Sequence, residues 1–219
     1  MFIVFRRFKG GVILGKQLWK PGNMVYPLPV VMISCQEENQ KPNIITVAWT
    51  GTICTNPAMV YISVRPERFS YGIISRSKEF VINLTTKQLV KEVDYCGVKS
   101  GREVDKFKEM KLTPIRGNEV LAPLIEECPV NIECKVTDIV KLGSHDMFIA
   151  KVVAVHADEK YLNKEGKFEL SKADPIVYSH GEYFKLGEKL GSFGYSIRKK
   201  GNKEKNSEKH SFNRNARSR

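Results

Sequence analysis

The chain has 219 residues, of which 42% are hydrophobic and 27% are charged, so it can form a folded core and is not disordered throughout. No apolar run approaches the ~20 residues of a membrane-spanning helix, and the apolar start is broken at once by Arg6 and Arg7, so we do not expect a secretion signal.

The formal net charge of +12 lies at the two ends of the chain. Residues 1–20 carry +5 and residues 198–219 carry +7, so residues 21–197 are neutral. Because a nucleic-acid-binding domain usually carries its basic stripe on the folded body, we do not expect a nucleic-acid partner. We predict an N-terminal extension at 1–11, one domain at 12–197 and a basic, disordered tail at 198–219.

The cysteines are odd in number and contain no C-x-x-C pair. Neither a disulfide framework nor a metal site is indicated, and a reducing, cytoplasmic compartment is expected. The five cysteines are Cys35, Cys54, Cys96, Cys128 and Cys134.

The first half of the chain alternates β-rich runs with one helix. Residues 25–35 and 43–54 predict a hairpin, and 59–64 a third strand. The apolar period changes over 68–77, which predicts a helix, and 79–84 predicts a fourth strand.

Two short helices are expected next. Thr85 with Gln88 resembles the capping box of a helix that ends at Gly97, and residues 102–110 form another charged helix.

The second half returns to strands. Apolar and polar residues alternate over 129–137. Val130 and every second residue after it are expected to face the core, whereas Asn131 and Glu133 are expected to face solvent. Residues 148–157 and 175–184 are further extended segments. Six or seven hairpin-linked strands with two or three short helices favour a small closed or partly closed barrel.

Four segments, in this order, resemble the flavin reductase-like family of FMN-binding split barrels, and its flavoredoxin branch most closely. They are residues 26–31 (YPLPVV), 43–51 (NIITVAWTG), 96–107 (CGVKSGREVDKF) and 143–148 (GSHDMF). The resemblance implies a mainly β, Greek-key type split barrel with a few short helices, which binds FMN and forms a homodimer.

The implied reaction is hydride transfer from NADH or NADPH to bound FMN, with onward electron transfer to an unknown acceptor, either a redox partner protein or a small molecule. Two alternatives stay open. One is an FMN-binding electron carrier without nicotinamide activity, and the other is a nucleic-acid-binding module that uses the basic ends.

The resemblance places several residues of the second segment at the flavin. Asn43 would face FMN, although Asn is also common at a strand start. Ala48 would let backbone amides approach the ring while Trp49 flanks it, although a buried core tryptophan is equally compatible. The flavin-facing residues implied here are Asn43, Thr46, Val47, Ala48, Trp49 and Thr50.

Other residues would hold the phosphate and ribityl groups. Ser70 is interpreted as the N-cap of its helix or as a phosphate ligand. Ser100 would shape the loop that delivers Lys106, and Lys106 would pair with the phosphate or ribityl oxygens. Arg65 and Arg68 flank Ser70, and one of them could reach the phosphate, but solvation is expected for each.

His145 is the implied catalytic residue, as a donor near the flavin ring or the nicotinamide, although it could be a simple turn histidine. The family form is commonly Gly-Asp-His, so Ser144 departs from it. Tyr178 would lie against the flavin or pack in the core. His156 and His180 are interpreted as structural.

Overall fold

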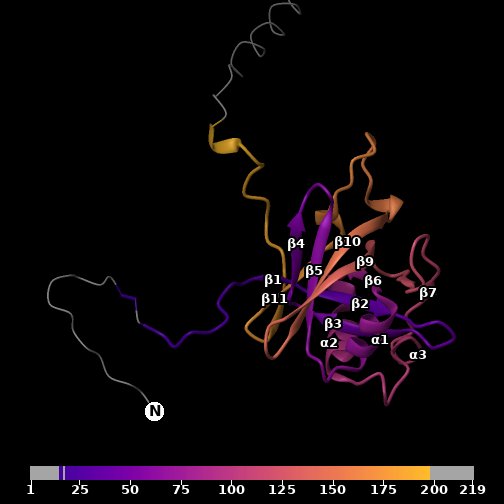
Figure 1. Cartoon of the computed structure of the whole chain (residues 1–219). Helices are drawn as coiled ribbons and strands as arrows, with labels where there is room; N and C mark the ends of the chain where they lie inside the picture. The colour runs from indigo at the N-terminus through magenta and orange to yellow at the C-terminus, as the bar shows by residue number, and fades with distance from the viewer. Residues whose placement is uncertain (1–14, 17, 198–219) are drawn as a thin grey trace, which may run out of the picture. The chain divides into compact units, whose positions relative to one another are not determined.

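The computed structural model describes residues 15–16 and 18–197, and its centre is one curled antiparallel sheet of seven strands (Figure 1). The predicted extension at 1–11 and tail at 198–219 lie outside the described residues. The strands follow one another across the sheet in the order β3 (Asn43–Val47), β2 (Val31–Cys35), β6 (Glu79–Leu84), β9 (Val130–Lys141), β10 (Asp146–Ala157), β5 (Met59–Val64) and β4 (Thr50–Cys54).

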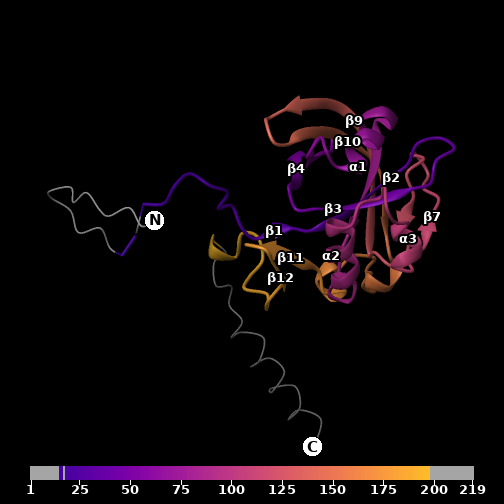
Figure 2. The ribbon, with the colours of Figure 1, turned by 90° about the horizontal axis from the view of Figure 1, so that it is seen from below.

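The two edge strands of this sheet, β3 and β4, are consecutive in the chain. Only Ala48 and Trp49 separate them, so the sheet has to curl until its two edges meet. Figure 2 shows β3 and β4 on the same side of the domain. The prediction of a mainly β, partly closed barrel is confirmed, and the nonsequential pairings of β6 with β2 and of β5 with β10 show that it is no simple meander.

Short elements surround the main sheet. A three-stranded sheet contains β1 (Leu28–Pro29), β11 (Ile176–Ser179) and β12 (Glu182–Lys185), and β7 (Pro114–Ile115) pairs with β8 (Leu124–Ile125). The α-helices are α1 (Phe69–Ser77), α2 (Val90–Val98) and α3 (Lys106–Glu109). Single 3₁₀ turns lie at Lys87–Leu89, Glu159–Tyr161, Leu170–Ala173 and Tyr195–Ile197.

The predicted strand at 43–54 is interrupted, because the chain crosses from one edge of the sheet to the other at Ala48 and Trp49. The capping box is wrong: the Thr85 hydroxyl donates to the carbonyl oxygen of Val30 at 2.5 Å instead of capping a helix. Helix α2 also continues past Gly97 to Val98.

Two apolar clusters cover the two faces of the sheet. The first fills the inside of the curl, where Ile73 and Ile74 of α1 pack against Phe80 and Phe148, which are both 0% exposed. The second lies on the other face, where α2 and α3 pack against β2 and β3; Val93 is among its members. The first helix therefore closes the barrel, and the other two cover it from outside.

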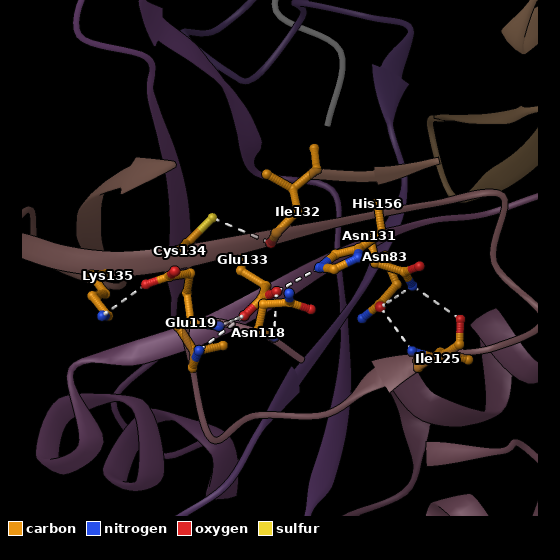
Figure 3. A network of polar contacts seen from close by, with 11 residues as sticks. Asn83, Asn118, Glu119, Ile125, Asn131, Ile132, Glu133, Cys134, Lys135 and His156 are labelled. Carbon is orange, nitrogen blue, oxygen red and sulfur yellow. Dashed lines mark hydrogen bonds and ion pairs between the residues drawn. The ribbon is translucent and has the colours of Figure 1, made fainter. Parts of the chain in front are cut away.

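The expectation that Asn131 and Glu133 face solvent is wrong. Asn131 is 7% exposed and donates hydrogen bonds to Asn83 and Ile125. Glu133 is 0% exposed, and its carboxylate accepts hydrogen bonds from the backbone N–H groups of Asn118, Glu119 and Val120, at 2.7–2.9 Å. His156 contacts the same carboxylate at 2.5 Å, as Figure 3 shows. The alternating pattern was right about β9, but it could not show that the 117–121 loop covers this face of the strand.

The chain divides after Lys185 into two compact units. The described part of the second unit, Leu186–Ile197, contains the 3₁₀ turn Tyr195–Ile197. Of the helices in the described residues, none has the length and hydropathy needed to cross a lipid bilayer.

Candidate functional site

Two adjoining cavities lie where the edges of the curled sheet meet. The larger has a volume of about 790 Å³ and the smaller about 440 Å³. They share Ile45, Arg65 and Arg68 in their walls, so they are two parts of one trough. Both volumes are of the size that holds a small-molecule ligand or cofactor.

The larger cavity brings together most of the predicted ring-binding residues. β3 is an edge strand, so alternate residues leave backbone N–H and C=O groups without a strand partner on this side. Such groups suit the polar edge of a flat ligand. The predicted residues that line this cavity are Thr46, Val47, Ala48, Trp49, His145 and Tyr178.

Trp49 and His145 form the flat part of this cavity. Their rings are parallel to within 3°, with centroids 6.0 Å apart. Trp49 is only partly buried, so it lines the cavity and is not a core tryptophan. The pKa of His145 lies below its ordinary value, because burial and then the nearby Arg65 charge disfavour the imidazolium. The local environment therefore favours the neutral imidazole of His145.

Tyr178 lies between the larger cavity and the outer apolar cluster. It lines the larger cavity with its ring centroid 6.4 Å from that of Trp49, and it also packs against the outer apolar cluster. Its neighbour Tyr183 lies 6.0 Å away and donates a hydrogen bond to Asp94 at 3.1 Å. Burial and this carboxylate raise the pKa of Tyr183 to about 12.

The smaller cavity is rich in positive charge. Among the described residues that line it, Glu67 is the acid, and it faces a set of basic side chains. The start of α1 adds to this charge, because no side chain caps its N–H groups. Cations at a helix start are a suitable environment for an anion such as phosphate. The basic residues are Arg65, Arg68, Lys99, Arg102 and Lys106.

Ser70 lies in the wall of the smaller cavity, but it is not the helix N-cap. Helix α1 begins at Phe69 with Arg68 in the cap position, so Ser70 is its second residue. It is 1% exposed and accepts a hydrogen bond from the side-chain amide of Asn43 at 2.8 Å. Gly101 packs so closely here that an added Cβ would lie 2.2 Å from Oδ1 of Asn43.

Lys106 is 4% exposed and two of its three N–H groups are already used. Its ammonium donates to the carbonyl oxygens of Ile44 and Cys96, at 2.7 Å and 2.8 Å. Burial lowers its pKa to about 8. Lys106 therefore joins β3 to the end of α2 and keeps one N–H group for a ligand in the smaller cavity.

Two further predicted residues have local roles. Thr50 lines neither cavity, since its side chain is buried and donates to the carbonyl oxygen of Tyr61 at 2.7 Å. Ser100 lines the smaller cavity, where its hydroxyl accepts a hydrogen bond from the N–H of Arg102 at 3.2 Å.

The sequence did not single out Arg65 and Arg68 as site residues, although they line both cavities. The available signal was their position in the segment that leads into the start of α1. Asp94 and Tyr183 were missed as well, and they meet only because the β11–β12 hairpin returns to α2. Among the described residues, no group of three or more His, Cys, Asp or Glu side chains could hold a metal ion.

Comparison with known proteins shows the family to which this chain belongs. Residues 23–187 match the family model of the flavin reductase like domain. The chain belongs to this flavin reductase like family. The structure also resembles flavoredoxin of Desulfovibrio vulgaris (Miyazaki F), with a TM-score of 0.78, 30% identity and coverage of 84% of this chain and 100% of that one.

Two further proteins are similar to this chain. Flavoredoxin from Methanosarcina acetivorans has a TM-score of 0.74 and 27% identity, and the match covers 84% of this chain and 100% of that one. An uncharacterised protein of Archaeoglobus fulgidus is 29% identical over 160 residues, which are 73% of this chain and 88% of that one.

The trough of this flavin reductase like protein fits a flavin. The larger cavity offers parallel flat rings and the exposed edge of β3, and the smaller one offers cations and a helix start. These are the two environments that a flat heterocycle and an attached phosphate require. Family and fold together indicate a flavin-binding redox function.

Proposed function

We propose that this flavin reductase like chain binds FMN and transfers hydride to it from NADH or NADPH, with electrons passing on to an acceptor. The observation that carries the proposal is the trough itself, in which the flat aromatic end adjoins the cationic end. When bound, FMN supplies the hydride and electron chemistry, and the protein binds and orients it.

The residues would divide the work between the two ends. Arg65, Arg68 and Lys106 would hold the phosphate, together with the N–H groups at the start of α1. The β3 edge, Trp49 and His145 would hold the ring. A terminal phosphate suits FMN, because the cations gather at one end of the trough.

The size of the larger cavity supports the use of a second substrate. At about 790 Å³ it lies in the upper part of the range for small-molecule sites, so a ring bound at Trp49 leaves room for a nicotinamide. Tyr178, Tyr183 and Asp94 also line this cavity and would be available to such a substrate.

The deciding experiment is the visible spectrum of the purified, untagged protein before and after anaerobic addition of NADH, and then of NADPH. Flavin absorption bands that bleach with either nucleotide support the proposal. Bands that persist with both favour the alternative, an FMN-binding electron carrier. A colourless protein that also fails to take up added FMN would overturn the flavin assignment.

We further propose that the chain forms a homodimer. The rim of the larger cavity carries two exposed apolar side chains, Val98 at 70% and Leu142 at 60% exposure, and a second copy would cover them. Light scattering coupled to gel filtration tests this, and a monomer at micromolar concentration would contradict it.

The proposed electron acceptor is a redox protein or a small molecule that reaches the part of the larger cavity left open by the second copy.

A further inference from the structure

The hydroxyl of Ser144 lies 2.9 Å from Nδ1 of His145. His145 is also held by the parallel indole of Trp49. Its other ring nitrogen, Nε2, has no hydrogen-bond partner among the residues that the structure describes. Nδ1 is therefore held by the Ser144 hydroxyl, and Nε2 is available to a ligand in the larger cavity that His145 lines.

The charged groups around the ring oppose its protonation. Arg65 and Arg68 approach from the segment between β5 and α1, and Glu67 only partly offsets them. Asp146, the next residue, accepts a hydrogen bond from the Tyr71 hydroxyl at 2.6 Å. No described carboxylate hydrogen-bonds to either nitrogen of the ring, so the charge of Glu67 is the attraction that favours an imidazolium, and it acts without a hydrogen bond.

Which ring nitrogen carries the proton depends on the partner of the other nitrogen. A carboxylate beside Nδ1 can only accept, so it would force the proton onto Nδ1. A hydroxyl can donate, and in water the neutral ring already prefers its proton on Nε2.

We propose that Ser144 is a positioning residue whose hydroxyl donates to Nδ1 of His145, so that His145 presents an uncharged Nε2–H donor to the larger cavity. The role of this donor rests on the proposed function, since the Nε2–H group would meet the flavin ring or the nicotinamide. His145 then orients its ligand by a hydrogen bond and carries no charge. The positive charge in this cavity comes from Arg65 and Arg68.

The state of His145 can be measured directly by long-range ¹H–¹⁵N NMR on histidine-labelled protein at neutral pH. The expected spectrum shows a protonated Nε2 and an unprotonated Nδ1. S144A should give a mixture of both tautomers, S144T should restore the wild-type pattern, and S144D should move the proton to Nδ1 and raise the pKa of the ring. A wild-type His145 that carries its proton on Nδ1, or on both nitrogens, overturns the inference.

The chain contains a matched control. Ser179 makes the same contact with Nδ1 of the following residue, His180, at 3.1 Å, and neither residue lines the larger cavity. S179A should leave the His145 signals unchanged. If S179A alters them as S144A does, the effect is not local and the inference is wrong.

A kinetic readout connects the tautomer with function. The ionisation of His145 in the pH profile for flavin reduction by the active nucleotide should lie at higher pH in S144D than in the wild type. Identical profiles for wild type, S144A and S144D would overturn the positioning role. Because the NMR needs no flavin, a protein with the expected tautomer but no flavin binding would refute the proposed function alone.

Discussion

The ammonium nitrogen of Lys106 lies 2.7 Å from the carbonyl oxygen of Ile44, on the strand edge that lines the trough. Lys106, which the sequence predicts only as a ligand-binding residue, therefore also stabilises the backbone around the site. Its second hydrogen bond, to Cys96, fixes the last turn of α2 in the same place. Substitution of Lys106 should affect stability as well as binding.

We expect Lys106→Met to lower the free energy of unfolding by about 1.5–3 kcal/mol, because two buried carbonyl oxygens lose a charged donor. Denaturant unfolding of the flavin-free protein measures this. Lys108→Met, two residues away and exposed, should change it by less than about 0.5 kcal/mol. Equal stability of the two variants would show that the Lys106 hydrogen bonds contribute nothing.

The affinity for FMN should fall as the pH rises through about 8, the pKa of Lys106. Below this pH the ammonium is charged and attracts phosphate, and above it the amine is neutral. A bound phosphate raises the pKa, so the fall extends to higher pH than 8. Titrations followed by flavin fluorescence at several pH values measure this.

Riboflavin, which has no phosphate, provides the control for this pH dependence. Its affinity should not change over the same range, and in Lys106→Met the slope for FMN should disappear. An FMN affinity that is constant from pH 7 to about 9.5 would place the phosphate away from Lys106.

Arg68→Gln should weaken FMN binding by about 1.5–3 kcal/mol, roughly a tenfold to hundredfold rise in Kd, because a charged hydrogen bond to phosphate is lost. The affinity for riboflavin should hardly change. Arg76→Gln is a matched control on the same helix, since Arg76 pairs with Glu37 outside both cavities. A similar loss for FMN and riboflavin would mean that Arg68 supports the ring end and not the phosphate.

Glu133→Gln should reduce the free energy of unfolding by about 1.5–3 kcal/mol, because an amide cannot accept all the hydrogen bonds that the carboxylate accepts. Thermal unfolding at pH 7 measures this, with the exposed Glu119→Gln as the control. No difference between the two variants would show that the 117–121 loop is held by other contacts.

The same carboxylate should make the protein sensitive to acid. Burial alone would raise the pKa of Glu133, but the hydrogen bonds from the Asn118 N–H and from His156 outweigh burial and lower it. A lowered folded pKa gives stability that is complete above the ordinary value of 4.5 and is lost as the pH falls below it. In Glu133→Gln, the fall in unfolding temperature below pH 5 should be smaller than in the wild type.

The β-rich architecture could be predicted from the sequence, and most of the residues expected at the flavin ring line the larger cavity. Alternating and β-branched runs predict strands because each needs one buried face, and this local pattern survives in the fold. The NIITVAWTG segment could be recognised as one unit because the residues of it that line the larger cavity, Thr46 to Trp49, are consecutive in the chain.

The meeting of the strand edges and the burial of charges could not be predicted from local sequence patterns. Arg65, Arg68 and Lys106 converge because β3, the start of α1 and the start of α3 come together in space, and no spacing in the sequence records this. Glu133 has a solvent-facing pattern, yet it is buried because a distant loop donates three backbone N–H groups to it. Charge burial depends on partners far away in the chain, whereas strand formation depends on neighbours, and this is why the second could be predicted and the first could not.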